Sequence, residues 1–188
     1  HWLYFLPCAR QSDIEADGHT KRGGFMPPVP LPRRMWAGNR IEFHAPVPLG
    51  AGVTRHSAIE TVEAKSGASG EMVFVTVRHE ISVDGELAIV EHHDIVYREA
   101  PKAASIRVDT AKTKLPPGEE GSQWTRTVTA DPVLLFRYSA LTFNGHRIHY
   151  DRDYCRNVEG YPGLVVHGPY TATLLVDRQR LFRRLRNL

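Results

Sequence analysis

Apolar and polar residues alternate through the middle of the chain, and such alternation is the pattern of β-strands with one buried face. The strand-like stretches are residues 40–44, 54–64, 71–83 and 87–97. The pair Asp84-Gly85 separates the last two stretches and favours a two-residue hairpin turn. Together these features predict an antiparallel meander of long strands over residues 39–98.

The segments on either side of this meander differ from it in composition. Residues 1–38 are rich in proline, glycine and charge, and the prolines of residues 26–32 exclude a helix or a central strand there. Residues 101–122 contain prolines and many charged side chains, which predicts a linker. A strand is predicted at residues 124–133, and a helix from about residue 169 to residue 186.

The composition limits the classes of protein to which the chain belongs. With 188 residues, of which 41% are hydrophobic, it can form one domain or two small ones. No apolar run approaches the length of a membrane span, which predicts a soluble protein. The net charge is +3, but residues 178–188 hold five arginines and no acid. This charge lies on the polar face of the predicted helix, which argues against a nucleic-acid-binding protein.

The most specific chemical feature is an ordered run between residues 136 and 169. It reads Phe-Arg-Tyr-Ser-Ala-Leu-Thr-Phe-Asn-Gly-His-Arg-Ile-His-Tyr-Asp and, further on, Tyr-Pro-Gly-Leu-Val-Val-His-Gly-Pro. Asn144 and His149 lie five residues apart on a predicted turn, which pairs an amide that can hold a water with an imidazole that can move its proton. Gly168 is predicted as the N-cap before Pro169, where its N–H could stabilise an oxyanion.

This run resembles the MaoC-like, (R)-specific enoyl-CoA hydratase and dehydratase family. It is most similar to the branch of hydroxyacyl-thioester dehydratases and of mesaconyl-CoA and itaconyl-CoA hydratases, which the segment from His1 to Leu6 resembles too. His149 falls on the histidine of the family signature, and His167-Gly168 falls on its His-Gly pair. The chain departs from the signature at Asn144, where the family has a catalytic aspartate.

The resemblance implies an α+β fold of the tandem (double) hot-dog type, in which antiparallel sheets wrap around a central helix. The first unit, residues 1–100, is expected to lack its front, and residues 123–188 form a second unit without its sheet. The family pattern predicts further strands after the last helix, and strands following Leu188 would favour an enzyme.

The resemblance also implies a hydro-lyase that adds water to an α,β-unsaturated acyl-CoA, with a short, branched, dicarboxylic acyl group. His149 is the predicted general acid/base, because Asn144 can orient a water but cannot carry a proton. Arg137 and Arg147 are expected to pair either with a substrate carboxylate or with acids of the protein. Tyr138 and His167 complete the expected substrate-binding residues. No metal or redox cofactor is expected, and the predicted protein is a cytoplasmic homodimer.

Other chemistries remain as alternatives or are disfavoured. A hot-dog thioesterase would want a carboxylate that Asn144 does not offer, and a non-catalytic acyl-CoA-binding module is the alternative from another class. Asn144-Gly145 could also be a simple turn, with His149 a core histidine. The groups His92-His93-Asp94 and His146-x-x-His149 lack a third metal ligand nearby, and Ser139 lacks partners for nucleophilic catalysis. The cysteines, Cys8 and Cys155, lack metal-type spacing and predict a reduced setting.

Overall fold

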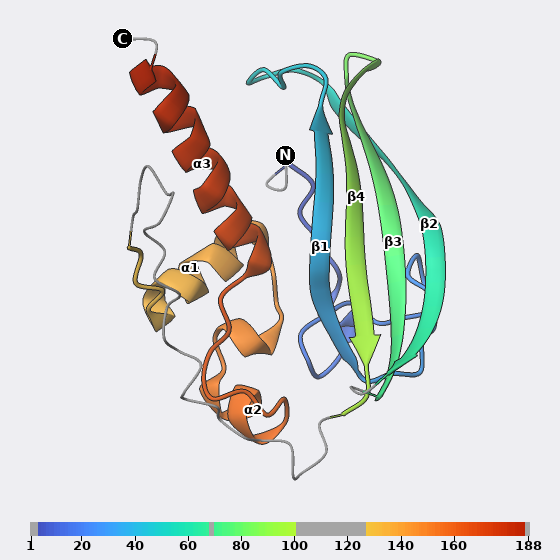
Figure 1. Cartoon of the computed structure of the whole chain (residues 1–188). Coiled ribbons are helices and arrows are strands. Elements are labelled where there is room, and N and C mark those ends of the chain that lie inside the picture. The colour runs from blue at the N-terminus through green and yellow to red at the C-terminus, as the bar shows by residue number, and fades with distance from the viewer. Residues whose placement is uncertain (1–3, 68–69, 101–126, 187–188) are drawn as a thin grey trace. The chain divides into compact units, whose positions relative to one another are not determined.

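The computed structural model describes residues 4–67, 70–100 and 127–186, which fall into two compact units, His1–Ala100 and Pro101–Leu188. The first unit contains a β-sheet and the second contains helices (Figure 1). The predicted linker, residues 101–122, lies outside the described residues.

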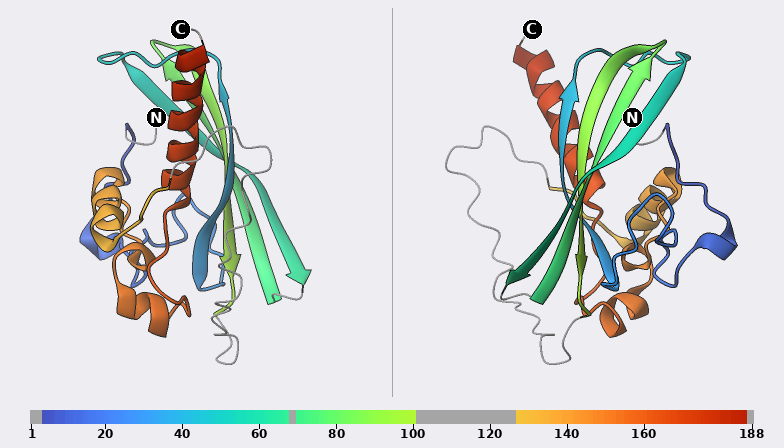
Figure 2. Two further views of the ribbon diagram at one scale, coloured as in Figure 1. Left: turned by 60° about the vertical axis from the view of Figure 1, so that its left-hand side comes forward. Right: turned by 90° about the vertical axis from the view of Figure 1, so that its right-hand side faces the viewer.

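The first unit is built on four antiparallel strands, as the alternating pattern predicts. The sheet has the order β1-β4-β3-β2 and a marked twist (Figure 2). Its strands are β1 (Arg33–Phe43), β2 (Val53–Gly67), β3 (Gly70–Val83) and β4 (Glu86–Arg98). β1 begins directly after the last proline of the Pro-rich segment and lies at one edge of the sheet, so no proline interrupts a central strand.

The predicted hairpin turn between β3 and β4 is confirmed. Asp84 and Gly85 have φ angles of 49° and 93°, and two consecutive positive φ values define the turn type that matches strand twist. Val83 pairs with Glu86, so the turn contains only these two residues. The pairing of β3 with β4 has a register shift between Ile81 and Ser82, close to this turn.

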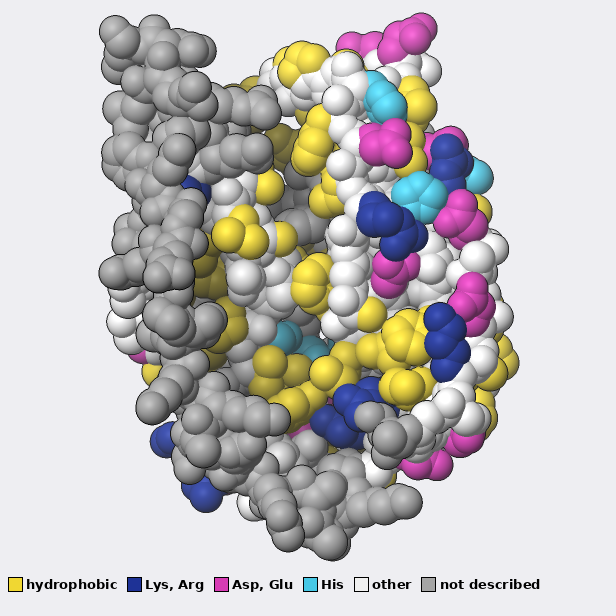
Figure 3. All heavy atoms as spheres, viewed as in Figure 1, with side chains coloured by type: hydrophobic (Ala, Val, Ile, Leu, Met, Phe, Trp, Pro, Cys, Tyr) yellow, Lys and Arg dark blue, Asp and Glu magenta, His cyan; other side chains and the backbone are white. Residues whose placement is uncertain are grey.

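The two faces of this sheet differ in polarity. Most of the buried apolar side chains lie on one face, among them Val75, Val77, Ile81, Ile89 and Tyr97. The other face carries ion pairs, including Arg40 with Asp94 at 2.6 Å, His92 with Glu60 at 2.8 Å and Arg78 with Glu80 at 2.5 Å. Basic, acidic and histidine side chains lie interspersed over this face (Figure 3). Exposed pairs of this kind add little stability, so burial of the apolar face holds the sheet together.

The Pro-rich N-terminal segment contributes to the apolar core of the first unit. Val29 is buried with Val75, Val77 and Tyr97, and Met26 and Leu31 pack against this cluster. The Arg22 guanidinium fixes the segment, because it donates to Glu15 at 2.9 Å and to the carbonyl of Leu31 at 2.5 Å. Residues 26–32 thus form no helix, as predicted, but they bury apolar surface.

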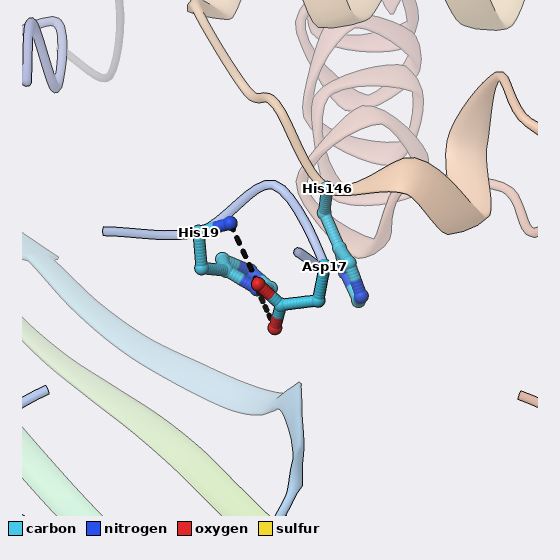
Figure 4. Close-up of side chains that lie close together, drawn as sticks. All are labelled: Asp17, His19 and His146. Carbon is cyan, nitrogen blue, oxygen red and sulfur yellow. Dashed lines mark hydrogen bonds and ion pairs between the residues drawn. The ribbon is translucent and has the colours of Figure 1, made fainter. Parts of the chain in front are cut away.

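A tight turn near the N-terminus is closed by Asp17 and His19. The His19 backbone N–H donates to Asp17 Oδ1 at 2.8 Å, and His19 Nδ1 lies 2.9 Å from Asp17 Oδ2 (Figure 4). Burial lowers the pKa of His19, and the hydrogen bond to Asp17 opposes that shift. The side chains of this turn are therefore partners of each other.

The described part of the second unit, residues 127–186, begins with a helix where the sequence predicts a strand. The elements in this part are α1 (Pro132–Thr142), the 3-10 turn η4 (Arg147–His149), α2 (Arg152–Asn157) and α3 (Gly168–Arg186). The strand predicted at 124–133 is wrong for its described part, since Pro132 occupies the first turn of α1 and Asp131 caps it by accepting from Leu134 N–H at 2.8 Å. An Asp-Pro pair is a helix start, and this capping outweighs the strand-like residues before it.

The last helix, α3, confirms the helix predicted from about residue 169 to residue 186. Gly168 is the first residue of the helix rather than its N-cap, because Thr171 N–H donates to His167 O at 3.2 Å. Between residues 127 and 186 the second unit contains no strand. Among the helices that the structure describes, none is long and apolar enough to cross a membrane.

Candidate active site

Two segments of the second unit are fastened together at His149. Val165 N–H donates to Ile148 O at 2.9 Å, and His149 Nδ1 lies 2.7 Å from Val165 O. The motif turn therefore lies directly beside the residues that lead into α3. This pair of contacts brings His149 near the His167-Gly168 step, although the two histidines lie 18 positions apart in the sequence.

The contact with Val165 determines the tautomer of neutral His149. A carbonyl oxygen can only accept a hydrogen bond, so Nδ1 carries the proton and donates to Val165 O. In the neutral ring the lone pair is then on Nε2. This is the state that a general base requires, and the backbone carbonyl supports the ring when Nε2 takes up a proton.

The ring of His149 lies between two other imidazoles. It stacks on His167, with 3.6 Å between ring centroids and 19° between planes, and it meets His146 edge-on at 5.5 Å. His167 Nε2 lies 2.9 Å from Ser139 Oγ on α1. Burial, and secondarily His149, lower the pKa of His167 to about 3, so His167 is neutral at physiological pH. His149 therefore rests on an uncharged aromatic surface.

Asn144 lies at the end of α1, where Phe143 takes a left-handed conformation with φ 52°. Asn144 Oδ1 accepts a hydrogen bond from His146 N–H at 3.0 Å, which closes an Asx-type turn. The amide of Asn144 is predicted to hold a catalytic water. In the structure the side-chain oxygen of Asn144 accepts the hydrogen bond of the turn, so the amide NH₂ is the group that could donate hydrogen bonds to a water. The role of Asn144 in catalysis stays a prediction.

Gly168 is half-buried at the start of α3, and its φ is not positive. Within the described residues its N–H has no backbone acceptor, as expected for the first turn of a helix. The positive end of the helix dipole lies here. The Gly168 N–H thus keeps the property that the oxyanion role demands, and that role also stays a prediction.

The two arginines of the motif have different surroundings. Arg147 donates to Asp151 Oδ2 through Nε at 3.0 Å and through Nη2 at 2.7 Å, and its guanidinium lies over the Tyr154 ring. Asp151 also caps α2 by accepting a hydrogen bond from Tyr154 N–H at 2.9 Å. The hydrogen bonds to Asp151 lower its pKa, and the one from Tyr154 N–H has the largest effect. Arg137 is exposed on α1. Arg147 therefore has a structural partner, and Arg137 is the better placed of the two to meet a ligand.

The remaining predicted substrate-binding residues pack together. The Tyr138 ring lies 4.8 Å from that of His167 and 5.0 Å from that of Tyr170. Burial raises the pKa of Tyr138. His167 is only 1% exposed, so it is closed to solvent in this structure. Ser139, for which the sequence predicts no partners for nucleophilic catalysis, is the hydrogen-bond partner of His167, and no spacing in the sequence indicates this pairing.

Cys155 is a structural residue of this unit. Its thiol donates to Gly163 O at 2.7 Å, and burial raises its pKa to about 11. A thiol with so high a pKa stays protonated and is a poor nucleophile. Cys155 thereby helps to hold the loop between α2 and α3.

A cavity in the first unit was not anticipated from the sequence. It has a volume of about 480 Å³ and is lined by Phe25, Met26, Arg55, Ser57, Val77, His79, His93 and Ile95. Ser57 Oγ lies 2.7 Å from His79 Nδ1, and burial lowers the pKa of His79 to about 4. Ser57, His79 and Glu91 are register partners on adjacent strands, so only the strand register, and not their sequence spacing, brings them together.

The histidines considered as metal ligands in β4 do not converge. His92 and Asp94 lie on the polar face, where His92 pairs with Glu60 and Asp94 with Arg40. His93 lies on the opposite face and lines the cavity. Adjacent residues of a strand point to opposite faces, so these three cannot bind one ion.

Comparison with known proteins decides the family. Residues 1–186 match the profile described as hydroxyacyl-thioester dehydratase type 2. The chain belongs to this family. It is 54% identical over 182 residues to the mesaconyl-C(4)-CoA hydratase of Chloroflexus aurantiacus, covering 96% of the chain and 62% of that protein. It is 25% identical to the mitochondrial hydroxyacyl-thioester dehydratase type 2 of Saccharomyces cerevisiae, covering 93% of the chain and 63% of that protein. The chain thus spans less than two thirds of the curated relatives it matches.

Solved structures support the fold of this family member. HtdX of Mycobacterium tuberculosis is similar with a TM-score of 0.54 and 17% identity, over 76% of this chain and 50% of that one. A MaoC-like dehydratase gives a TM-score of 0.51 and 18% identity, over 75% of this chain and 52% of that one. The predicted MaoC-like, hot-dog fold class is thereby confirmed.

Proposed function

We propose that the protein is a hydro-lyase that adds water reversibly to an α,β-unsaturated acyl-CoA, with His149 as its general acid/base. Membership of the hydroxyacyl-thioester dehydratase type 2 family supports the reaction class. The observation that carries the proposal is the hydrogen bond from His149 Nδ1 to Val165 O, which leaves the lone pair of the neutral ring on Nε2.

The reaction needs three contributions from the chain. His149 Nε2 takes a proton from water, and the oxygen of that water forms a bond to the β-carbon of the acyl group. The electron pair of the double bond moves towards the thioester and gives an enolate, whose oxygen is stabilised by the Gly168 N–H at the start of α3. The imidazolium of His149 then returns a proton to the α-carbon, which completes the addition of one water.

Asn144 assists by holding the water rather than by moving a proton. An amide has no titratable proton near neutral pH, so both proton transfers fall to His149. The Asx turn that Asn144 forms with His146 N–H keeps the amide group close to the same short loop. The proposed chemistry uses no metal or redox cofactor, and CoA enters as part of the substrate.

The proposed substrate is a short, branched, dicarboxylic enoyl-CoA of the mesaconyl type. The support is the 54% identity to a mesaconyl-C(4)-CoA hydratase, together with the exposed guanidinium of Arg137 beside the motif. Bidentate pairing of a guanidinium with a carboxylate would favour such a substrate over a monocarboxylic one. The proposal includes a homodimer as the working form.

The test is a screen of the purified full-length protein against a panel of enoyl- and hydroxyacyl-CoA thioesters. Mesaconyl-CoA, itaconyl-CoA and crotonyl-CoA, with their hydrated forms, cover the branched dicarboxylic and the simple monocarboxylic cases. The proposal predicts loss of the conjugated thioester absorbance and a preference for the dicarboxylic substrates. Release of free CoA without hydration would instead identify a thioesterase.

A further inference from the structure

Ser139 and His167 form a buried polar pair beneath the candidate base. Their side chains lie 2.9 Å apart, and the two residues are only 5% and 1% exposed. The His167 ring stacks on His149 at 3.6 Å, and Tyr138 meets it at 4.8 Å with an interplanar angle of 61°. The His167 side chain therefore contacts the proton-transfer residue while it is closed to solvent, so its ring acts on the reaction through His149 and not by touching the substrate.

The hydrogen bonding of this pair points to one orientation. Burial keeps His167 neutral, with a pKa of about 3, so its ring has one N–H and one lone pair. Among the described residues, His167 Nε2 is the acceptor that the structure offers to the Ser139 hydroxyl proton. Ser139 then donates to Nε2, and Nδ1 carries the proton of the ring.

The bond to Ser139 is the polar contact that fixes the His167 ring. His167 Nδ1 is buried and has no hydrogen-bond partner within the described part of the chain. A buried polar atom without a partner is costly, and such an orphan is tolerated where the surroundings hold the group in place. Ser139 supplies this hold from α1, which also contacts the His167 ring through Tyr138.

We infer that Ser139 is a positioning residue: its hydroxyl holds His167 as a neutral aromatic platform, and this platform orients His149 and stabilises its imidazolium form. The inference rests on the proposed function for the role of His149 in catalysis. It replaces direct substrate contact as the role of His167.

The physical reason lies in the charge that His149 gains when it takes a proton from water. A cation over the face of an aromatic ring is attracted to it, and the attraction grows when the pair is desolvated. A charged His167 would repel the imidazolium instead, so its neutrality matters. The other titratable rings around the stack are His146, at the edge of His149, and Tyr138, at the edge of His167.

The first test compares Ser139→Ala with the wild-type protein by NMR titration of the His149 ring proton, identified by its loss in His149→Ala. The inference predicts a downward shift of the His149 pKa by about half a unit. It also predicts a fall in kcat on the order of tenfold with little change in KM, because the substitution misorients His149 and leaves substrate binding unchanged. The control is Thr142→Val, since Thr142 Oγ1 donates to Tyr138 O at 2.8 Å and not to an imidazole.

A second pair of variants keeps the test valid if Ser139→Ala fails to fold. Combining Ser139→Ala with His167→Phe replaces both polar partners by apolar groups and retains a ring under His149, whereas combining it with His167→Leu removes the ring. The inference predicts a His149 titration close to wild type for the Phe variant and a shifted one for the Leu variant. Equal titrations in these two variants, or an unchanged pKa in folded Ser139→Ala, would overturn it.

The proposed function and the inference fail in different ways. A wild-type protein that hydrates no enoyl-CoA contradicts the proposed function, but the titration of His149 still reports on the platform. A wild-type protein that is active while the Ser139 and His167 variants leave both the titration and kcat unchanged contradicts the inference alone.

Discussion

The carbonyl oxygen of Val165 accepts a hydrogen bond from His149 Nδ1 at 2.7 Å. This contact joins the motif turn to the segment that leads into α3, and it specifies which nitrogen of His149 is basic. Because the acceptor is a backbone atom, substitution of the Val165 side chain leaves the bond in place. The tautomer of His149 is therefore set by the path of the backbone and not by a neighbouring side chain.

Replacement of Asn144 separates its turn-forming role from its role towards water. Asn144→Asp keeps an oxygen to accept from His146 N–H and restores the aspartate of the family signature, so we expect it to retain or raise activity. Asn144→Ala removes both the acceptor and the water-holding group. We expect a severe loss of turnover, whereas the lost turn hydrogen bond lowers the stability by only roughly 1 kcal/mol. Turnover of each variant, with its thermal midpoint as control, checks this. An inactive but folded Asp variant would mean that this branch uses a different water geometry.

Arg137 and Arg147 are expected to respond differently to substitution by glutamine. Arg137→Gln should reduce turnover of a dicarboxylic acyl-CoA far more than that of crotonyl-CoA, because a charge-assisted contact is lost only with the former. Arg147→Gln breaks the pairing with Asp151 and should affect both substrates alike, through the stability of the motif turn. The measurement is kcat/KM on the two substrates. Equal losses for Arg137→Gln would leave the dicarboxylic assignment without this support.

A side chain at Gly168 should interfere with the thioester more than with the fold. The φ of Gly168 is not in the left-handed region, so its backbone accepts other residues without strain. Gly168→Val is therefore expected to abolish activity while the thermal midpoint changes much less. Gly163→Ala is the matched control, since a Cβ there meets nothing within 4 Å. Full activity of Gly168→Val would mean that the thioester does not approach the Cα of Gly168, which would contradict its placement at the start of α3.

The stability of the first unit should depend on pH through His79. Burial lowers the pKa of native His79 from its usual 6.5 to about 4, so between these values the unfolded chain binds a proton that the native protein does not. Stability should accordingly fall as pH decreases from 6.5 towards 4 and then level off with respect to this group. His79→Gln is expected to flatten the thermal midpoint over this interval. His56→Gln, at a side chain that is 77% exposed, should retain the wild-type slope, and an identical slope in His79→Gln would contradict the assignment.

The sheet of the first unit was predictable because its signals are local. Alternation of side chains and the Asp84-Gly85 turn specify strands and their connection without reference to the rest of the chain. The start of the second unit was not predicted correctly, because Asp131-Pro132 caps a helix and this signal competes with the strand-like residues before it.

The candidate site was predictable only as far as the motif order reaches. His149, Asn144 and Gly168 could be proposed because they lie in one ordered run, whereas the pairing of Ser139 with His167 depends on how α1 packs against the residues before α3. For the same reason the sequence did not predict the cavity of the first unit, whose polar residues come from three strands in register. Contacts that depend on tertiary packing leave no spacing rule in the sequence.

The most direct test of the account is the rate of water addition by His149→Ala compared with the wild-type protein on the best substrate of the screen. We predict that kcat falls by about two or more orders of magnitude, because both proton transfers are assigned to His149. The near- and far-ultraviolet circular dichroism of the variant should match the wild type, which separates lost chemistry from lost structure. Near-normal turnover in a correctly folded His149→Ala protein would contradict the account.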